Sequence, residues 1–433
     1  MQVRQLVITK LFGTLDYSLA LNHKDHITIL HGPNGFGKTT ILRILHYFFN
    51  HQEIALAKIP FQECEILLED QSRIMLHKDQ VMSANSALTI SYQNQQYRLE
   101  PVSKNQDLMG VLHDIERSVP SLKRTGNNSW QYLPTQEIWS LEDVIDTFGQ
   151  SIPSLKYYLE EMRPEWLKQL QDRCDIRLID AQRLFLRHTL SEPSSLVSSM
   201  MDSVNFYSRE LVRLIQAELA RYAALAQSLD ISYPSRLLSG KTDILDEAQL
   251  KKKFQDLEKN RIRLLQTGLL SMDEQTEFEM PSRLEKHLRL AFSLYVEDTW
   301  NKLSLLSELA NRIELFTAIV NKLFSHKRLK IDKQRGFLFQ STQGHILSPD
   351  VLSSGEKHEM VLLYELLFKT PKGSLILIDE PELSLHVLWQ EEFLQQLQKI
   401  IKINECDVLV ATHSPEIIND RWDLTIALEG DNA

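Results

Sequence analysis

Residues 31–40 read His31-Gly32-Pro33-Asn34-Gly35-Phe36-Gly37-Lys38-Thr39-Thr40 and carry the strongest structural signal in the chain. The stretch fits the phosphate-binding pattern G-x-x-x-x-G-K-[ST] and lies between an expected strand, Ile27–Leu30, and an expected helix, Thr39–Phe49. Glycines let backbone N–H groups turn inward around phosphate oxygens, and the N-terminus of the following helix adds positive potential. This context predicts a nucleotide-binding loop in an α/β fold.

The polar residues of this loop have expected roles. Lys38 would bring positive charge to the β- and γ-phosphates, and the Thr39 hydroxyl would coordinate magnesium. The other loop residues expected to contact the nucleotide are Gly32, Pro33, Asn34, Gly35, Phe36, Gly37 and Thr40. A Gly-rich turn without a ligand is the alternative, and the strand–loop–helix context weighs against it.

A second apolar strand ends in two acids, in the segment Ser374-Leu375-Ile376-Leu377-Ile378-Asp379-Glu380-Pro381. Ligands of parallel sheets bind at the carboxyl ends of the strands. Asp379 would therefore hold magnesium, directly or through water, and Glu380 would polarise the attacking water as general base. An apolar run that ends in Asp-Glu is also a common strand terminus, so this segment is not specific when taken alone.

Two further segments carry residues that are expected to contact the nucleotide. Leu352-Ser353-Ser354-Gly355-Glu356-Lys357 opens a helical run, and small residues with free N–H groups at a helix start form an anion site that a partner's γ-phosphate can reach. Val408–Pro415 is another apolar strand, and it ends in His413, which would sense the γ-phosphate through a hydrogen bond. Taken singly, the first segment is more often a simple helix cap and the second a structural histidine.

The order of these four segments resembles the order of parts in ABC-type ATPases. Within that superfamily the chain resembles the RecF, SMC and OLD group, because Ser354 stands where transporters usually carry a second glycine and Glu356-Lys357 follows as in SMC-like proteins. The segment Glu380–His386 is similar to the one after the catalytic acid in ATPase subunits of bacterial anti-phage systems of the Septu, PARIS and retron types. The resemblance covers residues from about 1 to 100 and from about 328 to 428.

This resemblance implies an ABC-type ATPase head, a mixed sheet with flanking helices, that binds ATP and Mg²⁺ and hydrolyses ATP slowly. Two copies would close head-to-tail, within a dimer or a higher oligomer, and each site would join the loop and acids of one copy to Ser353–Glu356 of the other. If the protein acts in anti-phage defence, the expected partner is an effector such as a Toprim or HNH nuclease. The alternatives are a RecF- or SMC-like DNA repair ATPase, for which DNA is the partner, and a purely structural ATP-clamped oligomer. The family also has a Q-loop glutamine, for which Gln62 is an open candidate.

We expect four parts: the N-terminal half of the head at 1–105, a helical lid-like subdomain at 106–175, a helical insertion at 176–325, and the C-terminal half of the head at 326–433. Within the insertion, apolar residues step by threes and fours over 203–229 and again over 250–264. The segment 230–246 between them is rich in Pro, Ser and Gly. This pattern predicts a short antiparallel helical hairpin, too short for the long arms of an SMC protein.

Composition limits the class of protein and its partners. The net charge of −10 argues against a generally basic nucleic-acid coat, although basic clusters at 251–263 and 327–335 leave a local phosphate track open. The three cysteines are scattered, which suits reduced thiols in the cytoplasm. The chain begins with a strand-like alternation rather than a signal peptide, and no apolar run approaches the ~20 residues of a membrane span. We therefore expect a cytoplasmic protein with no membrane partner.

Overall fold

The computed structural model describes residues 2–83, 86–101, 115, 118–126, 129–133, 136–148, 152–180, 185–188, 199–239, 245–271, 285–383, 385 and 387–429. The chain forms two compact units, Met1–Met201 with Lys369–Ala433, and Asp202–Phe368. Within the first unit, the segment after 175 pairs as a parallel strand with Leu375–Ile378. The division into four functional parts stays a prediction.

The first unit contains a six-stranded antiparallel sheet. Its strand order is β2 (Leu15–Ala20), β1 (Val3–Leu11), β4 (Glu63–Leu68), β5 (Arg73–Lys78), β6 (Leu88–Tyr92) and β7 (Gln95–Leu99). Buried and exposed side chains alternate along β4 and β5, as expected where one face packs on a core. Strands β1 and β2 pair around the turn Phe12-Gly13-Thr14, and β6 pairs with β7.

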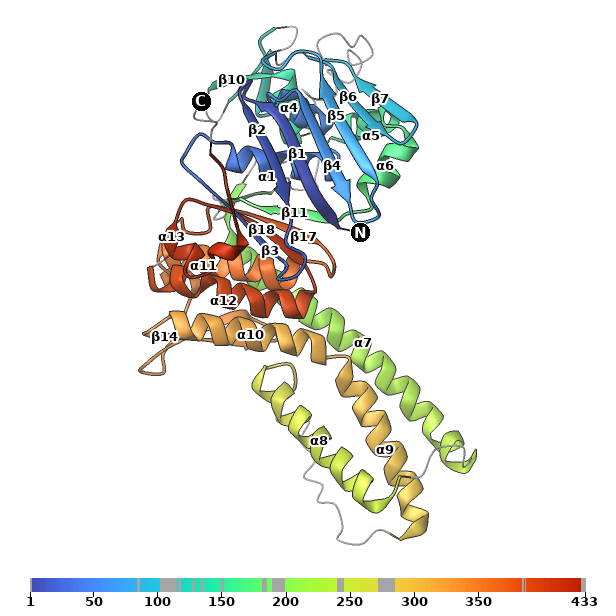
Figure 1. The fold of residues 1–433 in the computed structure, drawn as a ribbon. Helices are drawn as coiled ribbons and strands as arrows, with labels where there is room; N and C mark the ends of the chain where they lie inside the picture. Colours follow the sequence, from blue (N-terminus) through green and yellow to red (C-terminus); the bar gives the residue numbers. More distant parts are fainter. Residues whose placement is uncertain are drawn as a thin grey trace. The chain divides into compact units, whose positions relative to one another are not determined.

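A five-stranded parallel sheet forms the other half of this unit (Figure 1). Its strand order is β11 (Ile176–Ile179), β17 (Leu375–Asp379), β18 (Asp407–Thr412), β3 (Ile27–His31) and β19 (Thr425–Ala427). Every residue of β17 and β18 is buried, which explains their unbroken apolar sequences. Helix α1 (Lys38–Phe49) packs on this sheet and belongs to the same apolar core as the antiparallel strands. Because β3, β18 and β17 are parallel neighbours, their carboxyl ends lie at the same edge of the sheet.

The subdomain expected at 106–175 was predicted to be helical, and this is wrong in part. It contains a small antiparallel sheet of β8 (Leu122–Arg124), β9 (Ser129–Tyr132) and β10 (Glu137–Ser140), and residues 108–114 lie outside the described residues. Trp130 of β9 is fully buried in a small core shared with α4 (Leu141–Phe148). The strands are only three or four residues long, which is too short for a clear alternating pattern in the sequence.

The remaining elements of the first unit surround the two sheets. They are α2 (Glu53–Lys58), α5 (Pro153–Met162), α6 (Glu165–Gln171), α12 (Val387–Asn404), α13 (Pro415–Ile418), the 3₁₀ turn η6 (Trp422–Leu424), and the strand pair β12 (Phe185–His188) and β13 (Ser199–Asp202), whose last residue opens the second unit.

The second unit is mainly helical. Its elements are α7 (Ser203–Ser239), α8 (Glu247–Gln266), α9 (Lys286–Ser304), α10 (Ser307–Leu323), β14 (Lys327–Asp332), β15 (Gly336–Ser341), β16 (Ile346–Leu347), the 3₁₀ turn η4 (Pro349–Val351), α11 (Ser354–Tyr364) and the π-helical turn η5 (Glu365–Lys369). Strands β14, β15 and β16 pair in order.

The predicted hairpin within the insertion requires correction. Helix α7 continues through Pro234 to Ser239 instead of ending near Leu229, and its main partner is α9, which also packs against α8 (Figure 1). Two contacts hold the end of α7 on α9. Arg236 forms a bidentate ion pair with Asp298 at 2.6 Å, and the Tyr233 hydroxyl donates to the Ala291 carbonyl at 3.2 Å. These tertiary contacts extend the helix past a proline that local sequence marks as its end.

A buried ion pair ties α2 to the end of α5. The Arg163 guanidinium donates to both carboxylate oxygens of Glu53 at 2.7 Å, and Gln171 donates to the same carboxylate at 2.7 Å. Both charged side chains are 8% exposed. Removing only one partner of such a pair leaves the other charge buried and unpaired.

We therefore expect Glu53→Ala to destabilise the first unit by about 3–5 kcal/mol. The matched control is Glu160→Ala, which removes one partner of an exposed pair with Lys156 and should cost at most about 1 kcal/mol. Thermal unfolding followed by circular dichroism measures both. Equal melting temperatures for Glu53→Ala and the control would show that the buried pair does not hold the helices together.

Candidate functional site

The phosphate-binding loop connects β3 to α1 and folds around the head of its own lysine. Lys38 is the first residue of α1, and its ammonium donates to the carbonyl oxygens of Gly32 at 2.6 Å and Pro33 at 3.0 Å. The Tyr17 hydroxyl donates to the Phe36 carbonyl at 3.0 Å and fixes the other side of the loop. The side chain of Lys38 is buried, yet these partners are neutral oxygens. A phosphate group fits this loop because it would supply the opposite charge.

Two glycines let the loop pass close to neighbouring backbone and side chains. Gly37 has φ +83°, and a Cβ there would lie 2.6 Å from the Leu11 side chain. A Cβ on Gly32 would lie 2.6 Å from the carbonyl oxygen of Leu428. Larger residues at either position would push the loop away from the strands that hold it.

Thr39 and Asp379 meet at the edge of the parallel sheet. The Thr39 hydroxyl donates to Asp379 Oδ1 at 3.0 Å, and Asp379 is the last residue of β17. Burial raises the pKa of Asp379 to about 6, although the hydrogen bond from Thr39 opposes this shift. A bound cation would favour the charged form of this acid. A hydroxyl and a carboxylate are oxygen ligands of the kind that Mg²⁺ prefers, so the pair fits the metal.

The described residues contain no group of three or more His, Cys, Asp or Glu side chains placed to hold a metal ion. A magnesium ion at Thr39 and Asp379 would therefore take its other ligands from phosphate oxygens and water, which is common where this metal binds together with a nucleotide.

Glu380 and His413 follow the ends of adjacent strands, as predicted. Glu380 has φ +44°, an uncommon conformation for a non-glycine residue, and its N–H donates to the Ala411 carbonyl of β18 at 2.9 Å. His413 Nδ1 lies 3.9 Å from Glu380 Oε1 and 3.0 Å from Oε1 of a third acid, Glu382. Glu382 was missed as a site residue, although it stands only two positions after Glu380 in the sequence.

Ser353–Glu356 form the start of α11, which belongs to the second unit. Ser353 Oγ accepts from the Glu356 N–H at 3.3 Å, and the Glu356 carboxylate accepts from the Ser353 N–H at 2.7 Å. Lys327 adds a bond to each carboxylate oxygen, at 2.9 and 2.8 Å. Burial by itself would raise the pKa of Glu356, but the bonds from Lys327 and Ser353 outweigh it and lower the pKa. The helix start predicted here is confirmed, and the contacts of Glu356 are those of a capping box.

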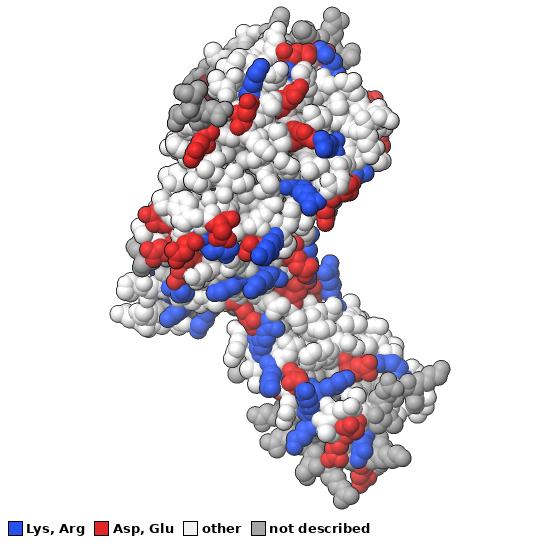
Figure 2. Space-filling view, in the orientation of Figure 1, with Lys and Arg blue, Asp and Glu red and all other residues white. Residues whose placement is uncertain are grey.

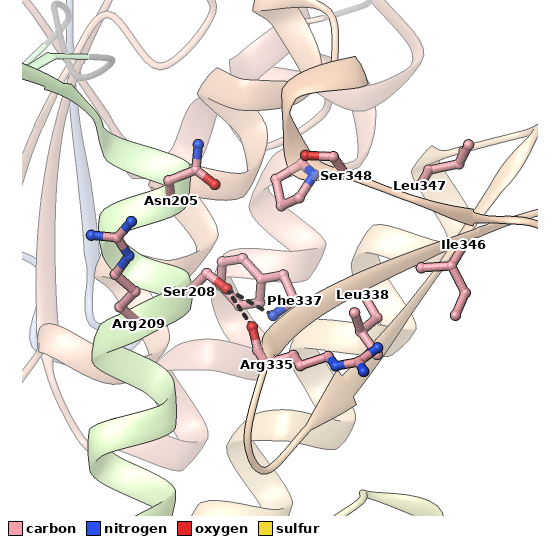
Figure 3. Close-up of a pocket in the computed structure, with 10 residues that line it drawn as sticks. Asn205, Ser208, Arg209, Arg335, Phe337, Leu338, Ile346, Leu347 and Ser348 are labelled. Carbon is pink, nitrogen blue, oxygen red and sulfur yellow. Dashed lines mark hydrogen bonds between the residues drawn. The ribbon is translucent and has the colours of Figure 1, made fainter.

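A pocket of about 260 Å³ lies beside the segment that leads into α11 (Figure 3). In that segment, Asp350 accepts hydrogen bonds from Asn205 of α7 at 3.0 Å and from Ser348 at 2.7 Å. The Ser208 hydroxyl bonds the backbone of β15 and the turn before it, at the Phe337 N–H and the Arg335 carbonyl. The approach to the Ser353 cap is thus attached to α7, which the sequence did not indicate.

Several members of the two basic clusters are paired with acids or carbonyl groups. In the insertion, Arg261 pairs with Glu258, Arg263 with Glu314, and Lys259 with Asp256. In the second cluster, Lys327 pairs with Glu356 and Arg328 donates to the Asn321 carbonyl. Figure 2 shows blue and red side chains interspersed over the insertion. Pairing of this kind favours a solvated charged face over a continuous phosphate track.

The comparison with known families decides the class of protein. Residues 1–418 match the AAA ATPase domain family. The chain belongs to this family. As an AAA ATPase domain, it binds nucleotide and hydrolyses ATP, and the predicted α/β fold class with a P-loop head and a helical insertion is confirmed. The role of each residue in the site stays a prediction, as does the candidate Gln62, which directly precedes β4.

Several solved structures are similar to this AAA ATPase domain. One is an Smc head domain with an extended coiled coil bound to the C-terminal domain of ScpA, from Pyrococcus furiosus, with 12% identity, coverage of 99% of this chain and 94% of that chain, and a TM-score of 0.37. Another is the SMC head domain from Thermotoga maritima, with 12% identity, 97% and 93% coverage, and a TM-score of 0.33. No match was found among curated protein sequences. Among the helices of the described residues, none combines the length and apolarity needed to cross a membrane.

Two substitutions separate nucleotide binding from hydrolysis in this AAA ATPase domain. Lys38→Ala removes a charge-assisted contact to phosphate and should weaken ATP binding by about 100-fold or abolish it. Glu380→Gln removes only the carboxylate predicted to act as the base, so it should leave ATP bound and reduce turnover by roughly 10²- to 10⁴-fold. Isothermal titration and phosphate release measure the two effects, with Lys24→Ala as an exposed-lysine control. Wild-type ATP affinity in Lys38→Ala would refute the assignment of the loop.

Proposed function

We propose that this chain is a cytoplasmic, magnesium-dependent ATPase of the ABC type whose copies close head-to-tail over ATP, and that it controls a separate effector in bacterial anti-phage defence. The observation that carries the ATPase assignment is the convergence of Thr39, Asp379, Glu380 and His413 at one edge of the parallel sheet. The effector most consistent with the sequence resemblance is a Toprim or HNH nuclease, and the ATPase would act as its sensor or scaffold.

In this proposal the chain's own residues divide the chemistry among them. Lys38 and the loop N–H groups bind the phosphates, and Thr39 and Asp379 hold Mg²⁺. Bound Mg²⁺ would neutralise negative charge on the phosphate oxygens. Glu380 accepts a proton from the attacking water, and His413 donates a hydrogen bond toward the γ-phosphate.

The proposed dimer adds the start of α11 from a second copy to each site. Within the described residues, no hydrogen bond uses the N–H groups of Ser354 or Gly355, and the side chain of Ser354 is exposed. Free N–H groups at the start of a helix attract anions, and the capping box on Ser353 and Glu356 holds this start in place. Because each site would be incomplete until two copies close, we propose that closure limits the rate and makes turnover slow.

A mixed dimer tests this arrangement. One copy carries Lys38→Ala and the other Ser354→Arg, and each variant alone should be inactive. In the mixed dimer, one site then contains both defects and the other contains only wild-type parts. We expect about one tightly bound ATP per purified, differently tagged mixed dimer. Mixed dimers that retain no more ATP than either mutant homodimer would show that the sites are not shared between copies.

A RecF- or SMC-like role in DNA repair is the second candidate, and one observation favours it. Lys251, Lys252 and Lys253 at the start of α8 are exposed and have no acidic partner among the described residues. Three adjacent lysines would contact a DNA backbone, but the pairing of the other basic residues leaves only a short track. A neighbouring gene for a Toprim or HNH protein would favour defence.

The two roles differ in their response to DNA. For the defence role we expect duplex DNA to leave the ATPase rate unchanged, and we expect the purified chain not to cut DNA with magnesium. In the repair role, DNA would stimulate turnover, and binding would weaken steeply with salt because each phosphate contact releases counterions. A salt series of binding and ATPase measurements, with Lys251, Lys252 and Lys253 replaced by alanine as the comparison, decides between them. DNA-stimulated turnover that the triple variant loses would contradict the defence assignment.

A further inference from the structure

The carboxylate of Glu382 holds the turn that carries His413. Its Oε1 accepts from the Thr412 hydroxyl at 2.8 Å and from the His413 backbone N–H at 2.9 Å. The same oxygen lies 3.0 Å from His413 Nδ1. Glu382 is 8% exposed, so one buried oxygen contacts a side chain, the backbone and the imidazole at the end of β18.

The distances identify which acid the imidazole contacts directly. His413 Nδ1 is 3.9 Å from Glu380 Oε1 and 3.0 Å from Glu382 Oε1, so Glu382 is the closer of the two acids. An ionised carboxylate can only accept hydrogen bonds. Contact with Glu382 therefore favours a proton on Nδ1 and leaves Nε2 as the ring nitrogen available for another partner. The side chain of His413 is 49% exposed, so the ring is accessible.

The second oxygen of Glu382 gives an independent reason to look for a functional role. Oε2 is buried and has no hydrogen-bond partner among the described residues. An unsatisfied buried oxygen costs free energy, and a residue selected only for stability would avoid that cost. The arrangement is understandable if the carboxylate is needed at Oε1 to set the position and protonation of the histidine.

We propose that Glu382 is a positioning residue for His413. It fixes the backbone turn after β18 through Thr412 and the His413 N–H, and it keeps a proton on Nδ1 while Nε2 faces the nucleotide. When ATP is bound, Nε2 takes up a second proton and donates to the γ-phosphate, because an imidazolium is stabilised between two anionic groups. The consequence for hydrolysis rests on the proposed role of His413, whereas the effect on the imidazole does not. Glu380 remains the base, and Glu382 acts on the reaction only through the histidine.

The experiment uses the full chain labelled with ¹⁵N-histidine, in which His413→Ala assigns the His413 resonance. In wild type we expect the proton on Nδ1. Glu382→Ala should give a mixture of tautomers, while Glu382→Gln should retain the wild-type state because its amide oxygen can still accept. The control is Glu391→Ala, an exposed acid on α12. If the alanine variant does not fold, Glu382→Asp, which retracts the carboxylate by one methylene group, is expected to lose the same contact.

Kinetics separates positioning from a merely structural role. In Glu382→Ala we expect kcat to fall on the order of 10- to 100-fold, as when a residue that orients an active-site group is removed, with ATP affinity nearly unchanged and partial rescue in Glu382→Gln. An unchanged His413 tautomer in Glu382→Ala overturns the proposal. So does a parallel loss of melting temperature, ATP affinity and kcat without rescue. Wild-type kcat in His413→Ala would instead refute the role of His413 in hydrolysis, and the tautomer measurement would still decide the role of Glu382.

Discussion

The hydrogen bond from Thr39 to Asp379 joins residues 340 positions apart, and the geometry of the site depends on the sheet that allows it. Strand β18 lies between β3 and β17, and its register aligns Ala411 with Leu30 on one side and with Asp379 on the other. A shift of one residue in either pairing would turn every side chain of the strand to the opposite face. Every residue of β17 and β18 is buried, which resists that shift and so also holds the catalytic candidates in place.

Charge within the site is unbalanced in a way that a ligand would correct. Among the described residues, the buried ammonium of Lys38 donates only to carbonyl oxygens of its own loop, and burial raises the pKa of Asp379. A nucleotide phosphate would pair with the first group and a magnesium ion with the second. In the buried Glu53–Arg163 pair, by contrast, both charges are supplied by the protein itself.

The segments on either side of α11 show how local and distant contacts combine. Ser353 and Glu356 cap the helix with their own side chains, and Lys327 from β14 reinforces the cap. Asn205 of α7 holds the preceding turn through Asp350. A helix start fixed from three elements of one unit can present its N–H groups without rearrangement. Attachment to α7 also means that changes in the helical insertion would reach this helix start through defined contacts.

The sequence by itself determined the strand–loop–helix at 31–40, the acids that end β17, the histidine after β18 and the capped start of α11, because each depends on residues adjacent in the chain. Only the tertiary structure decided the path of α7 through Pro234, where ion pairing of Arg236 with α9 outweighs the local tendency to end the helix. It also placed Glu382, rather than Glu380, against the imidazole of His413. Both acids lie near this histidine in the structure. Which of them contacts it depends on the conformation of the turn after the strand and on distances across the sheet, and the spacing of residues along the chain reveals neither.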